Sequence, residues 1–511
     1  MKKILSIAIL LIAYNSCFAQ EPADALKFSW TTQGGTARNQ AIGGAGVSLG
    51  GEFSSLFINP AGLGFYRTGE WVFTPGLALQ KNKNNYKDLL TKSAKNYFNL
   101  GASGAVFTGR PRYSTIIENY AIGIGINKSA DFSSDISYSG LNKLSSYSEQ
   151  YLEELFYNNV TNISDAANNY TYGSSLAYRS KLIDTIRDVD GSIAGYTSRA
   201  PILSGVNQQN NVISKGGVYD IALGGAVNLL DKWFLGASID GHLIYYNRKT
   251  NFRESDASTN TGNNFNFFQV DQSLITKGAG IGVKLGAIYK PVEYVRIGLT
   301  IHSPSVYVLT DNYSTDLTTD LEGYKGTTIQ KNSSKDFNAG KEGVTKYNLI
   351  TPWRAALGAS YVFREVENVQ KQRAFITGEV EYVNHRNSSF KADRVDNTQA
   401  FEYYNSVNNV IRQQYRGTFN FRLGGELKFN TVMFRLGGAY YMNPYRYDKG
   451  YKAKLSGGLG YRNKGFFADL TYSYAITKDV NYPYRLQDVA NEAAFIKSNS
   501  GNIFATIGFK F

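Results

Sequence analysis

The feature that most constrains this chain is a two-residue alternation of apolar side chains with small or polar ones, repeated in runs of about ten residues. Within residues 294–302, Ile297 and Leu299 share one face, and Arg296 and Thr300 share the other. Successive side chains of a β-strand point to opposite faces of the sheet. Each run therefore predicts a strand with one apolar face and one polar face.

The alternation recurs in fourteen runs, separated by gaps that are alternately long and short. The runs are residues 71–81, 97–107, 118–139, 217–229, 232–248, 270–290, 294–311, 351–363, 372–385, 416–429, 431–442, 453–462, 465–476 and 501–511. A soluble sandwich with this many strands would need several domains, and no linker separates them. The pattern predicts an all-β fold, a 14-stranded antiparallel transmembrane β-barrel over residues 71–511. Its long outer loops are expected at residues 140–216 and 386–415, because such barrels have short periplasmic turns and long outer loops.

The N-terminus predicts export. Lys2 and Lys3 precede a short apolar run, residues 4–13, and a small residue, Ala19, follows at a position suited to cleavage. We expect a signal peptide over residues 1–19. Lipid attachment at Cys17 is an alternative, although the preceding residues lack the leucine that such a site usually has.

Composition supports a membrane barrel and argues against a nucleic-acid partner. Aromatic residues make up 14% of the chain, including 38 Tyr and 30 Phe, as expected for aromatic girdles at two membrane interfaces. No segment outside the signal peptide reaches about 18 uninterrupted apolar residues, so no transmembrane helix is predicted. The net charge of +13 comes from scattered Lys and Arg rather than from a basic cluster.

A glycine-rich segment, residues 37–63, precedes the first strand and ends in Asn59-Pro60-Ala61-Gly62. Its glycines allow close approach of other chain segments, and Pro60 disfavours both helix and strand pairing. The composition fits either a compact plug or a long turn before the barrel.

Two of the long gaps have helical rather than strand periodicity. Ser146 and Glu149 fit a capping box, and a common apolar face follows it. This face consists of Tyr151, Leu152, Leu155 and Phe156. A second helix is predicted over residues 399–414. These apolar faces could cap the barrel by packing on each other or could form a landing surface for a hydrophobic ligand, and the two interpretations are compatible.

Several motifs resemble the FadL/TodX family of outer-membrane transporters of hydrophobic compounds. They are Ala45-Gly46-Val47 with Ser54-Ser55-Leu56-Phe57-Ile58-Asn59-Pro60-Ala61-Gly62-Leu63, Ala222-Leu223-Gly224-Gly225-Ala226 with Leu235-Gly236-Ala237-Ser238, and residues 284–291 with 296–304. The resemblance covers essentially the whole mature chain. It implies a barrel closed by an N-terminal hatch, here residues 20–70, an apolar landing surface among the outer loops, and a sideways exit through a break in the third strand. It also implies a monomer, and recognition of the C-terminal Phe511 by the barrel assembly machinery.

The resemblance assigns the hatch motif to Asn59, Pro60, Ala61 and Gly62. A strand-3 exit would involve Asn127, Lys128 and Ser129. The parity of the third run would place Lys128 in lipid, so either this strand kinks or Lys128 lies at the outer interface, and we favour the interface.

Polar candidates in the lumen are Asp240, His242, His302 and Arg296, for which hydrogen bonds and ion pairs are the expected role. The histidines lack metal-ligand spacing, so no metal site, no cofactor and no catalytic residues are predicted. The expected function is non-enzymatic, passive gated uptake of a hydrophobic small molecule, such as a long-chain fatty acid, across the outer membrane of a Gram-negative bacterium. The alternatives are a diffusion porin and a haem receptor of the same fold.

Overall fold

The computed structural model of the chain describes residues 22–30, 34–113, 116–258, 260–326, 329–363, 373–394, 398–447 and 451–511. The predicted signal peptide, residues 1–19 with Cys17, lies outside the described residues.

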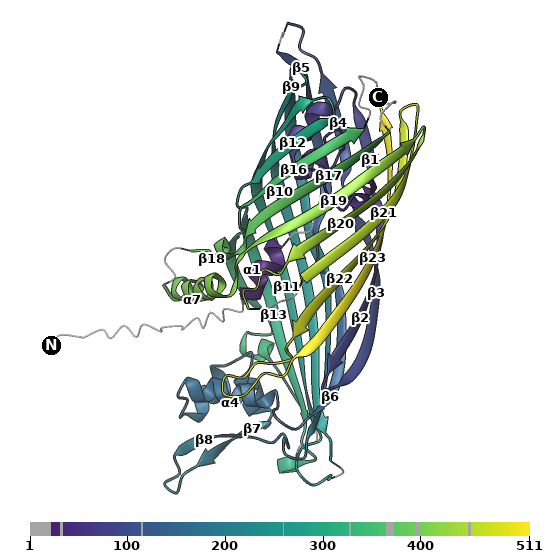
Figure 1. The fold of residues 1–511 in the computed structure, drawn as a ribbon. Coiled ribbons are helices and arrows are strands. Elements are labelled where there is room, and N and C mark those ends of the chain that lie inside the picture. Colours follow the sequence, from purple (N-terminus) through teal and green to yellow (C-terminus); the bar gives the residue numbers. More distant parts are fainter. Residues whose placement is uncertain are drawn as a thin grey trace, which may run out of the picture.

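The wall is a closed antiparallel barrel of fourteen strands, several of which are divided into two or three segments (Figure 1). In chain order these are β1 (Glu70–Phe73) with β2 (Pro75–Tyr86), β3 (Leu89–Leu100) with β4 (Ser103–Gly109), β5 (Ile117–Asp131) with β6 (Ser134–Asn142), β9 (Val206–Leu229), β10 (Trp233–Asp256), β11 (Phe267–Val292), β12 (Val295–His302) with β13 (Val306–Asp320), β14 (Ile329–Ser333) and β15 (Gly343–Ile350) with β16 (Arg354–Phe363), β17 (Ala374–Asn384) with β18 (Ser389–Ala392), β19 (Gly417–Phe429), β20 (Val432–Met442), β21 (Tyr451–Asn463), β22 (Phe466–Asn481) and β23 (Ala494–Lys510). The last strand, β23, pairs with β22 and also with β1 and β2, which closes the sheet on itself. The predicted fold class is confirmed.

The outer face of the wall is apolar and the inner face is polar. On β10, Leu235, Ile239 and Leu243 are 42–55% exposed, whereas Ser238 and Asp240 on the opposite face are at most 2% exposed. A barrel with an apolar outer surface can be solvated by lipid while its backbone groups pair around the ring. No helix among the described residues is long and apolar enough to cross a bilayer.

The helices lie in the N-terminal segment and in the loops. They are α1 (Pro22–Ser29), α2 (Ala37–Ala41), α3 (Ser55–Ile58), η1 (Pro60–Phe65), α4 (Ser148–Tyr157), α5 (Ile163–Asn168), α6 (Ser174–Arg179), η2 (Tyr324–Gly326), η3 (Ser334–Phe337), η5 (His385–Asn387) and α7 (Thr398–Gln414). A hairpin of β7 (Ile183–Arg187) and β8 (Ile193–Ser198) joins α4 at the end of the barrel far from the C-terminus (Figure 1).

Several strands extend well into residues that the sequence assigned to loops. The strand β9 begins at Val206, β13 continues to Asp320, and β15 lies wholly within a predicted gap. These extensions contain many Asn, Thr and Ser residues, so they lack the apolar alternation of a lipid-facing strand. Ladder hydrogen bonds form them without a lipid-facing pattern, and inward side chains such as Leu317 and Leu349 pack in buried apolar clusters. The predicted third run, 118–139, is also interrupted at residues 132–133.

Residues 34–66, here called the lumenal segment, lie inside the barrel. Helix α2 contacts β20 to β23, and η1 contacts β9, β10 and β11. Nearly every residue of the segment is buried, including Phe53, Leu56 and Leu63 at 0% exposure. The lumenal segment therefore fills the interior of the barrel near the end that carries the short turns.

Candidate functional site

Asn59 joins the lumenal segment to itself and to the wall. Its side-chain amide donates to the Val47 carbonyl at 2.6 Å and reaches the carbonyls of Ala287 and Leu299 at 3.4 Å. Its Oδ1 accepts from the Ala61 amide at 3.2 Å, which caps η1. Because Asn59 is fully buried, each of these bonds is needed to offset the loss of hydration.

Wall glycines make room for this motif. A Cβ at Gly286 would lie 1.8 Å from Asn59 Oδ1, and one at Gly298 would lie 2.2 Å from the Val47 carbonyl. A Cβ at Gly236 would meet the Pro60 carbonyl group. These three glycines belong to the strand motifs that carried the family resemblance, and the structure shows their role as a docking surface for the lumenal segment.

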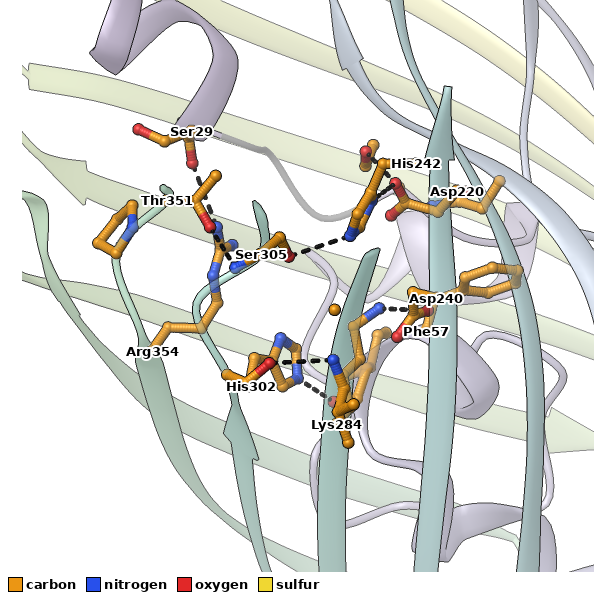
Figure 2. A pocket seen from close by; sticks show the side chains of 18 of the residues that line it. Ser29, Phe57, Asp220, Asp240, His242, Lys284, His302, Ser305, Thr351 and Arg354 are labelled. Atoms are coloured by element: carbon orange, nitrogen blue, oxygen red, sulfur yellow. Dashed lines mark hydrogen bonds and ion pairs between the residues drawn. The ribbon is translucent and has the colours of Figure 1, made fainter. Parts of the chain in front are cut away.

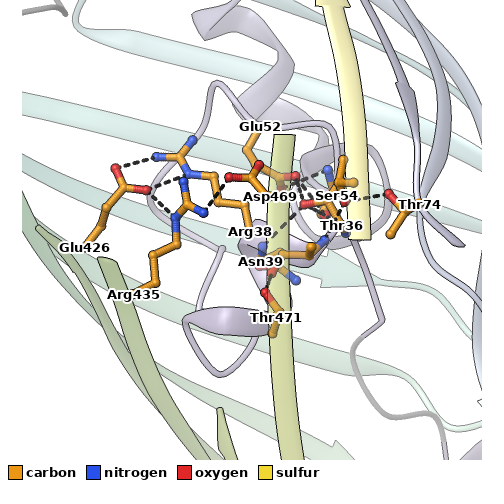
Figure 3. A network of polar contacts seen from close by, with 12 residues as sticks. Thr36, Arg38, Asn39, Glu52, Ser54, Thr74, Glu426, Arg435, Asp469 and Thr471 are labelled. Atoms are coloured by element: carbon orange, nitrogen blue, oxygen red, sulfur yellow. Dashed lines mark hydrogen bonds and ion pairs between the residues drawn. The ribbon is translucent and has the colours of Figure 1, made fainter. Parts of the chain in front are cut away.

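A network of buried ion pairs lies where the lumenal segment meets β19, β20 and β22 (Figure 3). The Arg38 guanidinium contacts both carboxylate oxygens of Glu426, at 3.1 and 3.3 Å. Arg435, at 2% exposure, donates to Glu426 and to Asp469 at 2.6 Å each. A second buried pair of inward charges joins Arg422 on β19 to Glu379 on β17 at 2.6 Å.

Glu52 completes this anchored region from within the lumenal segment. Its carboxylate accepts hydrogen bonds from the Thr36 hydroxyl and from the Ser54 amide, the latter at 2.9 Å. Burial raises the pKa of the Glu52 carboxyl, while these hydrogen bonds and the charge of Arg38 oppose the shift. Glu52 thus belongs to the hydrogen-bonded interior of the segment.

Helix α1 packs among aromatic side chains in the lumen. The Phe28 ring lies 5.6 Å from Phe132 and 6.1 Å from Tyr246, edge to face with both. Tyr415, next to α7, donates to the Pro22 carbonyl at 2.8 Å. The helix is therefore packed between the wall and the base of the α7 loop.

A polar cavity of about 80 Å³ lies between α1 and the lumenal segment (Figure 2). Three predicted lumen residues line it: Asp240, His242 and His302. Asp240 pairs with Lys284 at 2.9 Å, and His302 Nε2 donates to the Ile58 carbonyl at 2.9 Å. The fourth predicted lumen residue, Arg296, does not line this cavity.

Arg296 binds the lumenal segment instead of the cavity. Its Nη1 donates to the Leu49 carbonyl at 2.6 Å, and its guanidinium lies 4.8 Å from the centre of the Phe65 ring. The inward parity of Arg296 was predicted correctly, but parity alone does not specify the level along the barrel axis at which a side chain lies.

The barrel ladder is interrupted between β3 and β6, and we call this boundary the seam. Within the described chain, β3 pairs only with β2, and β6 pairs only with β9. Side chains bridge the seam instead: Thr91 and Ser93 of β3 donate to the carbonyls of Ser137 and Asp135, each at 2.6 Å. Asn84, a buried residue of β2, also donates to Ser137, so β6 lies against the inner side of its neighbours.

Strand β5 is irregular where it reaches the seam. Its register with β9 shifts between Lys128 and Ala130. Lys128 pairs with Asp131 and lies 5.7 Å from the ring of Tyr97 on β3, with a side chain only 5% exposed. The shift agrees with the predicted alternative of a kinked strand, and the interface location favoured for Lys128 stays a prediction.

The start of the lumenal segment lies against the inner end of the seam. The Gly35 amide donates to Asn127 Oδ1 at 3.1 Å, and the Ala102 amide donates to the Gly35 carbonyl at 3.1 Å. Gly34 and Gly35 also line the polar cavity, together with Asn127 and Ser129. The predicted strand-3 residues thus separate the cavity from the break in the wall.

The predicted outer ligand surface is mostly occupied by the loop itself. Tyr151 and Leu155 are 3% and 0% exposed and belong to the core under α4, and Leu152 packs against that core. Phe156 is 72% exposed. The apolar face of α4 is therefore an internal packing face, and of the four predicted residues only Phe156 is open to solvent.

Sequence reasoning missed α1, Ser305 and the cavity that Asp220, His242 and Ser305 share. The segment before residue 30 has no strong periodicity, and Ser305 lies in a short break between β12 and β13. The pairing of β9 with β10 sets Asp220 opposite His242, which the inward parity of both residues could have suggested. Among the described residues, no group of three or more His, Cys, Asp or Glu side chains is placed to hold a metal ion.

Comparison with known proteins gives structural but not sequence matches. No protein-family model matches the chain, and no curated protein matches it. A Pseudomonas aeruginosa FadL homologue is 13% identical, with a TM-score of 0.52, over 94% of this chain and 100% of that one. The P. putida toluene transporter TodX is 12% identical, with a TM-score of 0.52, over 94% of this chain and 99% of that one. This chain therefore has the FadL/TodX fold, as the sequence resemblance implied.

Proposed function

We propose that this chain carries hydrophobic small molecules across the outer membrane of a Gram-negative bacterium by passive diffusion through a gated barrel. The observation that carries the proposal is that Gly34 and Gly35 lie between the polar cavity and the interrupted wall. Movement of these residues would connect the cavity with the lipid beside β3 and β6. The lumenal segment would then act as a hatch, and the seam as a lateral exit.

The filled lumen favours this function over a diffusion porin. An open channel needs continuous water along the axis, whereas residues 34–66 are buried against strands all around the ring. The two histidines of the cavity disfavour a haem receptor, since His302 Nε2 is bound to a backbone carbonyl and both ring nitrogens of His242 have partners. The toluene transporter among the structural neighbours supports a transport role rather than an enzymatic one.

The remaining steps of the proposal are those that the resemblance to the FadL/TodX family implies. The ligand would enter at the end of the barrel that carries α4 and α7, where Phe156 is the exposed apolar residue of α4. The barrel would act as a monomer surrounded by outer-membrane lipids, and Phe511, which is 66% exposed, would present the C-terminus to the assembly machinery. A long-chain fatty acid is one candidate ligand.

Uptake in cells tests the function. The full chain would be expressed in a Gram-negative host that lacks its own barrel for hydrophobic compounds, and uptake of labelled toluene, decan-1-ol and oleate would be compared with the empty vector. We expect uptake of at least one compound to rise and the purified barrel to conduct few ions in a planar bilayer. No increase for any compound, together with free ion conductance, would contradict the proposal and favour a porin.

A further inference from the structure

The cavity contains a hydrogen-bonded array of Asp220, His242 and Ser305 (Figure 2). His242 Nδ1 lies 2.7 Å from Asp220 Oδ1, and His242 Nε2 lies 3.0 Å from Ser305 Oγ. All three side chains belong to residues that are at most 8% exposed. With Asp220 accepting from Nδ1, the imidazole accepts the Ser305 proton at Nε2, and a lone pair of Ser305 Oγ is left to accept a further hydrogen bond.

From this array we infer that the cavity binds the uncharged hydroxyl head of an amphipathic hydrocarbon, an alcohol or phenol, in preference to a carboxylate. The inference rests on the proposed transport function and specifies its substrate class. The cavity, of about 80 Å³, has room for a small polar head.

The charges around the cavity disfavour an anionic head. Its two lining cations already contact carboxylates: Lys284 with Asp240 at 2.9 Å, and Arg354 with Glu381 at 3.8 Å. Asp220 adds a further negative charge that faces His242 and Ser129. An incoming carboxylate would have to compete for these cations and approach Asp220, whereas a hydroxyl needs only one donor and one acceptor.

The cavity has an apolar side on which the hydrocarbon would continue. Phe57, Ile58 and Tyr307 line it, and Tyr307 lies 5.3 Å from the His242 ring. Tyr307 also belongs to the apolar cluster that contains Leu309 and Ile244. The polar array and the side chains of Phe57, Ile58 and Tyr307 therefore face the same cavity, so a polar head and the first carbons of its chain can contact them together.

The array resembles a nucleophilic triad, but its surroundings suit binding. The Ser305 amide donates to Thr351 Oγ1 at 2.8 Å, so it is not available to an oxyanion. Acyl transfer needs donors aimed at that developing charge. The array therefore orients a hydroxyl rather than activates Ser305.

Binding of matched ten-carbon compounds tests the inference. Native mass spectrometry of the full chain in amphipol would measure decan-1-ol, decanoate and decylamine at neutral pH, for the wild type and for Ser305→Ala and His242→Gln. Ser498→Ala is the matched control, because Ser498 is on β23 and bonds to Gln80 away from the cavity. A folding check is the heat-dependent shift in gel migration that folded barrels show.

We expect decan-1-ol to bind best, and Ser305→Ala and His242→Gln each to weaken its binding about fivefold, the equivalent of about one hydrogen bond. Ser498→Ala should leave the preference unchanged. Equal or tighter binding of decanoate or decylamine, or an unchanged preference in both cavity variants, would overturn the inference. Hydrolysis of decyl acetate that is lost in Ser305→Ala would also overturn it. Cellular uptake of decan-1-ol and oleate without discrimination would overturn this inference alone and leave the transport function standing.

Discussion

The lumenal segment meets the barrel wall in two different ways. Toward β19 it is held by the ion pair of Arg38 with Glu426, and Arg435 connects Glu426 to Asp469 within the wall. Toward the seam it is held by two uncharged hydrogen bonds of Gly35. Buried, paired charges are costly to separate, whereas a single neutral hydrogen bond contributes about 1 kcal/mol. The difference suggests a fixed anchor on one side and a movable closure on the other.

The largest expected effect is on the anchored side. Replacing Arg435 with Leu leaves the carboxylates of Glu426 and Asp469 without this buried partner, and should destabilise the barrel by about 3–5 kcal/mol. The measurement is the temperature at which the folded gel band disappears. The control is Lys331→Leu, because Lys331 is 63% exposed and its pair with Asp316 should contribute about 1 kcal/mol or less. Equal losses in the two variants would show that the network that holds Glu426 for Arg38 does not stabilise this side of the barrel.

An intermediate effect is expected at Asn59. Asn59→Ala removes the donor to Val47 and the acceptor for Ala61 and should cost about 1–3 kcal/mol. Asn59→Asp keeps the acceptor but loses the donor. A comparable loss of stability in the two variants would therefore assign the effect to the hydrogen bonds that the Asn59 amide donates. Folded-band stability and ion conductance would be measured beside Asn463→Ala, which removes only an exposed bond to Tyr461. A stable, non-conducting Asn59→Ala barrel would show that the motif does not hold the segment.

The smallest stability effect is expected at the seam. Thr91→Val removes the hydroxyl that donates to Ser137 and should cost about 1 kcal/mol, but it should raise the uptake rate because it loosens the closure. Thr471→Val is the matched change on the anchored side, where the hydroxyl donates to the Ala37 carbonyl at 2.6 Å. It should cost about as much stability without faster uptake. If both variants raise uptake equally, the two sides do not differ in the proposed way.

The sequence predicted the barrel well because lipid imposes a simple pattern. The alternation of apolar and polar residues predicted the strand number and the inward orientation of Asp240, His242 and His302. Backbone pairing between neighbouring strands then determines which residues lie opposite each other. The sequence-based prediction of strands failed for the segments that do not face lipid, because these lack the alternation. Extensions such as β15 are held by ladder bonds and by inward side chains such as Tyr347 and Leu349, which pack against residues distant in sequence.

The candidate site was only partly predictable. The register shift after Lys128 depends on contacts with β9 and β3, residues distant in sequence. Likewise, the hydrogen bond of His242 with Ser305 joins β10 to the break between β12 and β13, and nothing in the local sequence of either residue indicates it. Helix α1 is short and gains its burial from the lumen rather than from its own periodicity.

A disulfide lock tests the central claim, that Gly34 and Gly35 form the movable closure of the seam. A Cβ at Gly34 would lie 2.7 Å from Asn127 Oδ1 and 2.9 Å from the Lys128 carbonyl oxygen, so a Gly34→Cys/Asn127→Cys pair places the two thiols side by side across the closure once the backbone shifts slightly. A Ser48→Cys/Ser360→Cys pair, whose native hydroxyl oxygens are 2.6 Å apart, would instead tie the body of the segment to β16. Cys17, in the predicted signal peptide, is the sequence's one native cysteine.

Uptake would be measured for both oxidised pairs, before and after reduction. We predict that the bond at Gly34 stops uptake and that reduction restores it, while the bond at Ser48 leaves most of the uptake in place. Full uptake with the Gly34 bond formed, or equal block by both bonds, would contradict the account.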